Sequence, residues 1–291
     1  MTKDSGSTGS GGTGSTGSTG ATTAPPVTEA QYQAALTATD GALAAAVRNV
    51  GAARTPATVT AAIDALRQSV DTEADRLSAI SSPVPVRDAH FSLVVALRGL
   101  SRELSGGDLD PVCAGSSALS LISRGTQLAN VRSAAQTLAT ADPAHPYTIG
   151  SFAPKSTNDA KRRLGNGTLI KRASGGLGQL KISNGGSTDS VISVVPSNAK
   201  KATVTVYVRA KGKYTVRGIR DATYRVYMTS GADWDAKART FTRDCAFEQF
   251  DDTFEFTTTS RQYTIWEITL TPVVGGNATS STVDPDAFPV G

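Results

Sequence analysis

Between residues 28 and 142, apolar side chains recur every three to four positions, which is the spacing of helices that bury one face. The pattern predicts four helices, which begin near Tyr32, Pro56, Pro85 and Ala118. A threonine before Pro56 supplies a typical helix N-cap, and proline is favoured at the first helical position. Most of the connections are short, so we expect an antiparallel four-helix bundle.

From about residue 166 the apolar period changes to two, which is typical of half-buried strands. Clusters of glycine, asparagine and aspartate separate these short runs. We therefore expect an antiparallel β-sandwich over residues 166–275. Residues 143–165 hold prolines and no period and are predicted to be a linker, and residues 276–291 a C-terminal tail. One predicted strand places three valines on the same face: Val204, Val206 and Val208.

Residues 1–27 form a segment of a different kind. Of the first twenty residues, seventeen are glycine, serine or threonine. Such a segment buries too little apolar surface to offset the entropy lost on ordering, so we expect a disordered tether. Runs of this type resemble the stretch that follows the lipidated cysteine of bacterial lipoproteins. The resemblance implies a membrane anchor ahead of the tether and export of the protein, although a cytosolic protein with a disordered tail remains the alternative.

Composition is that of a protein with ordinary hydropathy. The chain of 291 residues is 39% hydrophobic and 19% charged. No run approaches the 18 apolar residues that a transmembrane helix needs, so no membrane span is expected. No apolar signal segment follows Met1, which leaves two readings: the protein stays inside the cell, or a signal has been removed.

The two cysteines, Cys113 and Cys245, lie in different halves of the chain. An exported protein tends to pair its cysteines, whereas a cytosolic protein keeps them as buried thiols. Both states therefore remain open. If the two cysteines pair, the disulfide joins the predicted helical and β domains.

Charge is spread unevenly. Residues 151–220 carry a net charge of +12, and residues 221–291 carry −6. One interpretation is a cationic face that binds an anionic polymer, with Lys200 and Lys201 as candidate contacts. The other is that basic and acidic strands neighbour one another and cancel. Most aromatic residues of the β-rich part are expected to fill the sandwich core. Trp234 lies between two aspartates in a predicted loop and is the best candidate for an exposed ring that contacts a ligand.

Catalytic signals are weak. Outside the glycine, serine and threonine run of residues 1–20, the sequence has no GxSxG, P-loop, HExxH or GxGxxG motif. His90 and His145 fall in different predicted segments, and the acidic residues lack the spacing of an EF-hand. We therefore expect no catalytic residues, no cofactor, no metal and no enzyme activity. A recognisable nucleic-acid-binding motif is also missing, so nucleic acid is not an expected partner.

The stretch KGKYTVRGIRDATYRVY at residues 211–227 resembles the signature of prealbumin-like sandwiches, which include carboxypeptidase regulatory-like and collagen-adhesin B-type modules. Ala222 departs from the pattern, because these families usually carry glycine there. The resemblance implies a module that binds, spaces or stiffens. It also implies five core residues: Tyr214, Val216, Ile219, Tyr224 and Val226.

The arrangement of the whole chain resembles lipoproteins and secreted proteins of the actinobacterial cell envelope. The segments TRDCAFEQFDDTFEFTTT and GGNATSSTVDPDAF carry this resemblance. It implies a lipid-anchored or secreted protein at the extracellular face of the cytoplasmic membrane or in the cell wall. Expected partners are a cell-wall polymer, the membrane surface or another envelope protein. We expect a non-enzymatic binding, adhesive or scaffolding module; the alternatives are a cell-wall polysaccharide-binding module and an enzyme with an interdomain site.

Overall fold

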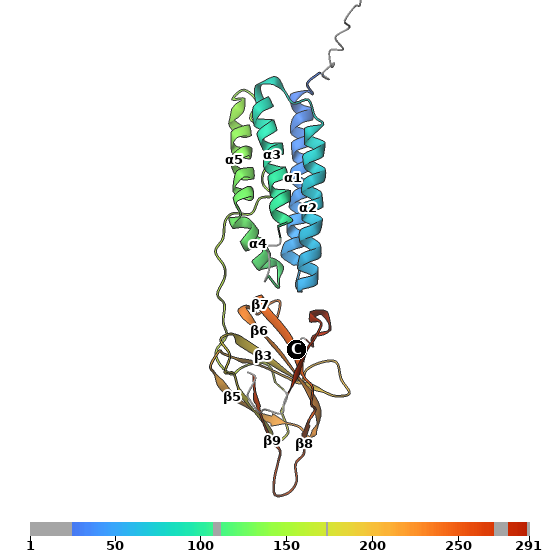
Figure 1. The fold of residues 1–291 in the computed structure, drawn as a ribbon, viewed down its shortest axis with the longest axis vertical. Helices are drawn as coiled ribbons and strands as arrows, with labels where there is room; N and C mark the ends of the chain where they lie inside the picture. The colour runs from blue at the N-terminus through green and yellow to red at the C-terminus, as the bar shows by residue number, and fades with distance from the viewer. Residues whose placement is uncertain (1–24, 107–111, 173, 271–278, 290–291) are drawn as a thin grey trace, which may run out of the picture.

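The computed structural model describes residues 25–106, 112–172, 174–270 and 279–289. The predicted tether at residues 1–27 lies outside the described residues except for its last three. The molecule is elongated, with helices at one end and β-sheets at the other (Figure 1). We call the region of helices α1 to α5 the helical half and the region of strands β1 to β10 the β half.

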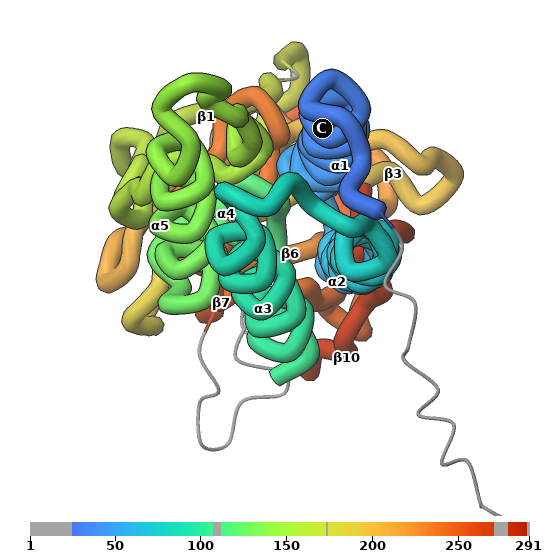
Figure 2. The backbone as a smooth tube through the Cα atoms, turned by 90° about the horizontal axis from the view of Figure 1, so that it is seen from above, coloured from blue at the N-terminus to red at the C-terminus, as the bar shows by residue number. Residues whose placement is uncertain are grey.

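The helical half contains five α-helices. They are α1 (Glu29–Ala52), α2 (Pro56–Ser78), α3 (Arg87–Leu104), α4 (Gly115–Arg124) and α5 (Thr126–Ala141), and a short 3-10 helix, Val84–Val86, precedes α3. Thr28 and Thr55 begin α1 and α2 with capping boxes, because each side chain accepts a backbone N–H of the first turn. Seen along their axes, α1, α2, α3 and α5 stand side by side (Figure 2).

The single fourth helix predicted over residues 118–140 is wrong, because this stretch belongs to two helices, α4 and α5. Gly125 between them has an extended backbone (φ −59°, ψ 144°) that ends α4. The Glu103 carboxylate accepts the backbone N–H of Gln127 at 2.6 Å and thereby caps α5. A Cβ at Gly125 would lie only 2.1 Å from Glu103 Oε1, so glycine is the residue that fits this approach.

The segment that follows α5 packs against the helices. Tyr147 and Phe152 are 2% and 3% exposed and belong to the core of the helical half. The Asp40 carboxylate on α1 accepts the backbone N–H of Gly150 at 3.0 Å. Gly150 also lies close to α5, because a Cβ added at Gly150 would be 3.2 Å from the Cβ of Ala135. The first part of the predicted linker at 143–165 therefore lies between α1 and α5.

The β half contains two sheets. The strands are β1 (Thr168–Lys171), β2 (Gly178–Ser183), β3 (Asp189–Pro196), β4 (Val204–Val208), β5 (Lys213–Ile219), β6 (Ala222–Asp235), β7 (Thr240–Phe250), β8 (Phe254–Phe256), β9 (Ile265–Thr269) and β10 (Ser280–Thr282). The larger sheet has the order β1-β4-β3-β6-β7-β10, with β8 paired to β6, and the smaller sheet has the order β5-β2-β9.

Every pair in the larger sheet is antiparallel, but β2 and β9 pair in parallel. The expectation of a purely antiparallel sandwich is therefore wrong at this pair. The cause is the path of the chain: β8 pairs within the larger sheet, and residues 257–264 lead from it to β9 in the smaller one. The direction of β9 is thus set by the crossing between sheets.

Alternating side chains of both sheets form the core of the β half, as in a β-sandwich. This core includes the predicted valines of β4. The 211–227 stretch contributes four buried residues and Tyr214, which is partly buried. Beyond β10, Phe288 packs edge-to-face on Tyr227 and Phe247, so residues 283–289 cover part of the outer face of the larger sheet. None of the described helices is long and apolar enough to cross a membrane.

The packing of residues 146–154 predicts that Phe152→Ala destabilises the protein by about 3–5 kcal/mol, because it leaves a cavity in the core. Phe91→Ala is the control, since Phe91 is 67% exposed and its loss is expected to cost at most about 0.5 kcal/mol. Equilibrium urea unfolding followed by circular dichroism measures both. Equal effects of the two variants would contradict the packing of this segment.

Candidate functional site: the joint between helices and sheets

The two halves are joined covalently. Cys113, in the connection before α4, forms a disulfide with Cys245 of β7, with a Cα–Cα distance of 6.2 Å. The backbone N–H of Cys113 also donates to the carbonyl of Thr242 at 2.9 Å. Two residues later, Gly115 N–H donates to Ala53 O at the end of α1. The connection before α4 thus links the end of α1 to β7.

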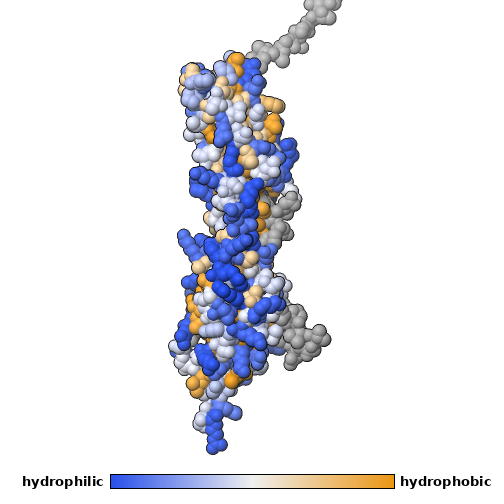
Figure 3. Space-filling model, turned by 90° about the vertical axis from the view of Figure 1, so that its left-hand side faces the viewer, coloured by the Kyte–Doolittle hydropathy of each residue, from blue (hydrophilic) through white to orange (hydrophobic). Residues whose placement is uncertain are grey.

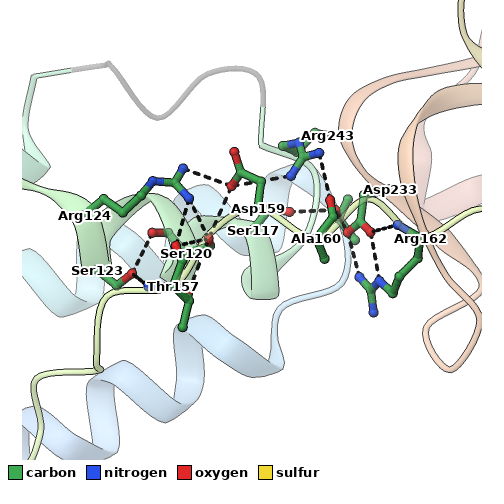
Figure 4. Close-up of polar contacts among 11 residues, drawn as sticks. Ser117, Ser120, Ser123, Arg124, Thr157, Asp159, Ala160, Arg162, Asp233 and Arg243 are labelled. Atoms are coloured by element: carbon green, nitrogen blue, oxygen red, sulfur yellow. Dashed lines mark hydrogen bonds and ion pairs between the residues drawn. The ribbon is translucent and has the colours of Figure 1, made fainter.

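We call the region where α4 and the connection before it meet β6 and β7 the joint. A chain of polar side chains crosses this joint beside the disulfide. Ser117 Oγ of α4 donates to Thr242 Oγ1 of β7 at 2.6 Å, and Thr242 Oγ1 donates to Asp233 Oδ2 of β6 at 2.6 Å. Asp233 also accepts from Arg162 Nε at 2.8 Å and from Arg162 Nη2 at 2.7 Å, so the ion pair is bidentate (Figure 4). α4, the segment at Arg162 and the β6–β7 hairpin are therefore linked through one carboxylate and the threonine that donates to it.

A second ion-pair group lies on the same side. The Asp159 carboxylate sits between Arg124 of α4, at 2.9 Å, and Arg243 of β7, at 3.4 Å (Figure 4). Arg243 Nη2 also donates to Ala160 O at 3.0 Å. Ser120 of α4 donates to Asp159 at 3.3 Å. Residues 157–160 are thereby held by both halves.

The buried carboxylate of Asp233 is strongly acidic. Its burial would raise the pKa, but hydrogen bonds from Arg162 and Thr242 outweigh this effect and lower the pKa to about 2. The hydrogen bond from Arg124 likewise lowers the pKa of Asp159. A general base works best with a pKa near the working pH. The arrangement therefore favours fixed charge pairs over proton transfer at neutral pH.

Asp189 at the start of β3 repeats the arrangement of Asp233. It accepts two hydrogen bonds from Arg163, both at 2.6 Å, one from the Tyr207 hydroxyl and one from Ala210 N–H. Burial opposes ionisation, yet these donors lower its pKa to about 2. We call residues 142–167, between α5 and β1, the connecting segment. Arg162 and Arg163 attach its end to the β half. An open depression of about 570 Å³ lies between the two carboxylates, lined by Lys161, Arg163, Asp189, Gly231, Asp233 and Arg243.

The expectation of an exposed ring at Trp234 is wrong. Trp234 is 3% exposed and packs edge-to-face on Tyr207 and Phe241. The segment predicted as an acidic loop is the β6–β7 hairpin, in which Trp234 pairs with Phe241 across the ladder. Its backbone N–H donates to Arg162 O. The indole is therefore unable to stack on a ligand at the surface.

Lys200 and Lys201 are exposed in the turn between β3 and β4. This turn follows Pro196, whereas Trp234 lies near the Asp189 end of β3. The structure therefore does not bring these candidates together. Within the described residues, no group of histidine, cysteine, aspartate and glutamate could hold a metal ion.

Sequence reasoning missed the ion pairs that Arg162 and Arg163 form with buried carboxylates. Arg162 and Arg163 belong to the segment of net charge +12, and their partners are Asp233 and Asp189. The opposite net charges of residues 151–220 and 221–291 indicated that ion pairs could form between them, but not which residues pair. Figure 3 shows hydrophilic residues gathered across the middle of one side of the molecule.

The acidic pKa values predict how stability depends on pH. In the folded protein the carboxyl groups of Asp189 and Asp233 have pKa values of about 2, below the pKa of about 3.9 that an aspartate has in an unfolded chain. Their contribution, roughly 2 kcal/mol each, is therefore complete above about pH 5 and is lost as the pH falls toward 2. Thermal unfolding between pH 7 and 2 measures this loss.

Asp233→Asn is expected to destabilise the protein at pH 7 and to flatten the acid limb of the profile. Asp64→Asn, at an exposed position of α2, is the matched control and is expected to follow the original protein. If the stability of Asp233→Asn fell with decreasing pH as steeply as that of the original protein, the role assigned to this carboxylate would be contradicted.

The contacts at the joint are thus of three kinds: a disulfide, paired hydrogen bonds and two buried or half-buried ion-pair groups. Together they fasten α4 and the connecting segment to β6 and β7. The joint residues carry charge in fixed pairs. No family model matches this chain, and neither a curated protein nor a solved structure matches it.

Proposed function

We propose that this protein is a non-enzymatic protein of the cell envelope, held by the tether at residues 1–27. The helical half is a rigid spacer, and the β half is the binding or adhesive head that it carries. One observation carries the proposal. The first described residues, before α1, and the smaller sheet lie toward opposite ends of an elongated molecule (Figure 1).

The helices supply the length of the spacer. With 24 residues, α1 is about 36 Å long. α1, α2, α3 and α5 run along the long axis of the molecule (Figure 1). A head joined to their lower end would therefore stand well away from whatever holds the tether. This geometry suits a protein that presents a surface at a distance.

The joint supplies the rigidity of the spacer. A flexible linker would let the head swing, because relative motion is the default for two units with a small interface. Here the Cys113–Cys245 disulfide and the Asp233 ion pair restrict that motion. The connecting segment adds further restraint, because it packs on α1 and α5 before it reaches the sheets.

The same disulfide supports the proposed compartment. Disulfides persist in oxidising surroundings and are rare in the cytosol. Together with the composition of the tether, this supports an exported protein at the extracellular face of the cytoplasmic membrane or in the cell wall. We propose a lipid anchor ahead of the tether, as in the actinobacterial envelope proteins that the chain resembles.

We extend the proposal to the finer fold. α1, α2, α3 and the consecutive pair α4–α5 act as an antiparallel four-helix bundle, and the two sheets as a prealbumin-like sandwich. The domains are residues 28–142 and 166–275, separated by 143–165 and followed by the tail at 276–291. The burial of Tyr147 and Phe152 supports counting the start of the connecting segment with the helical domain.

The two alternatives differ in their support. An enzyme with a site at the joint would need groups free to react, and the carboxylates there are held by arginines. A polysaccharide-binding head has a specific observation in its favour: among the described residues, Lys181, Lys213 and Arg217 lie on one sheet face and form no ion pair with an acidic side chain within 4 Å.

The proposal predicts that the head is reachable from outside the cell. The full-length protein is expressed in its native cell with a short epitope inserted at Ser260, in the exposed hairpin between β8 and β9. Antibody is expected to label intact cells as strongly as permeabilised ones. A cytosolic protein with the same epitope is the control. Labelling that requires permeabilisation would overturn the proposed location.

A further inference from the structure

The outer face of the smaller sheet, made by β5, β2 and β9, carries exposed side chains of a distinctive kind. Leu180 and Ile182 of β2 are buried in the core, so the alternating residues Gln179, Lys181 and Ser183 point outward. The registers extend this face across the sheet. Its outward rows are Arg217–Gln179–Ile265, Thr215–Lys181–Glu267 and Lys213–Ser183–Thr269.

Three cations of this face have no acidic partner within 4 Å among the described residues: Lys181, Lys213 and Arg217. All three are exposed. The contrast with Arg162 and Arg163, which are committed to buried carboxylates, is clear. Lys213 and Arg217 are four residues apart on one strand, which separates them by about 13 Å.

Apolar and aromatic side chains border these cations. Tyr263 and Ile265 are 42% and 47% exposed, although large apolar side chains usually lie inside. Gln179 Nε2 donates to the Tyr263 hydroxyl at 3.0 Å, which fixes the ring beside the outward row of Gln179. Trp266 alternates with Ile265 and Glu267 and packs on Phe254 of the core, so it belongs to the opposite face at the edge of the sheet.

Lys181 has Glu267 opposite it in its row, whereas the rows of Lys213 and Arg217 hold no acidic residue. Cations and an exposed aromatic ring on one sheet face match a particular class of ligand. Carboxylate or phosphate groups complement the cations, and the C–H faces of sugar rings pack on aromatic rings, which combine an apolar body with a polar tip. β9 lies near the end of the molecule farthest from the helices (Figure 1). Figure 3 also shows hydrophobic residues just above the hydrophilic lower tip.

We infer that the outer face of the β5-β2-β9 sheet binds an anionic glycan. Lys181, Lys213 and Arg217 contact its carboxylate or phosphate groups, and Tyr263 packs on a sugar ring. This inference rests on the proposed function, because it assigns a ligand class to the head. Its distance from the tether end favours a polymer over the lipid surface that would hold the tether.

The test is binding of the full chain to immobilised polygalacturonate and phosphomannan in low salt, measured by biolayer interferometry. Lys181→Gln with Lys213→Gln is expected to weaken binding at least about tenfold, since each exposed charge contributes modestly and the two act together. Lys200→Gln with Lys201→Gln is the matched control, because it makes the same charge change in the β3–β4 turn. It is expected to change binding less than about twofold.

Variants of Tyr263 separate sugar contact from charge alone. Tyr263→Ala is expected to weaken binding, and Tyr263→Phe, which keeps the ring, to retain most of it. Neutral dextran, inorganic polyphosphate and phosphatidylglycerol vesicles serve as comparison ligands and are expected to bind more weakly than the anionic glycans. Circular dichroism melting checks that each variant is folded.

Three results would overturn the inference: no retention on either anionic glycan, equal losses in the two lysine pairs, or stronger binding of polyphosphate or vesicles. These failures are distinguishable from failure of the proposed function, which the epitope at Ser260 tests separately. A head that is labelled on intact cells but retained on neither glycan refutes this inference alone.

Discussion

The buried carboxylate of Asp233 is the interaction on which the shape of this molecule depends. It accepts a bidentate pair from Arg162 and a hydrogen bond from Thr242, which in turn accepts from Ser117 of α4. A buried charge without partners costs several kcal/mol, so moving Asp233 away from its hydrogen-bond donors would destabilise the protein. The helices, the connecting segment and the β6–β7 hairpin therefore have one favourable arrangement, which the disulfide secures covalently.

The connecting segment extends this arrangement into the helical half. Its first part is built into the helical core through Tyr147 and Phe152, and its last part is tied to the sheets through Arg162 and Arg163. The segment therefore transmits restraint from one half to the other along much of the molecule. A rigid spacer needs this property, and a chain of prolines and polar residues between two domains would not provide it by itself.

Helices and strands were predictable because their apolar periods are regular, and the capping threonine before Pro56 marks its helix directly. The break at Gly125 was missed because it depends on Glu103, which is distant in sequence. The burial of Trp234 was missed because its flanking aspartates suggested a loop, whereas Asp233 is neutralised by Arg162. Pairings of this kind require knowledge of which segments meet, and composition does not contain it.

A rigid connection between the two halves would fix the distance between the two ends of the molecule. Spin labels at the exposed positions Ala30 and Ser260, introduced without added cysteines, are read by pulsed electron paramagnetic resonance. A single narrow distance distribution is expected, which broadens when Cys113→Ser, Cys245→Ser and Arg162→Gln are combined. A broad distribution in the unaltered protein would contradict the rigid spacer.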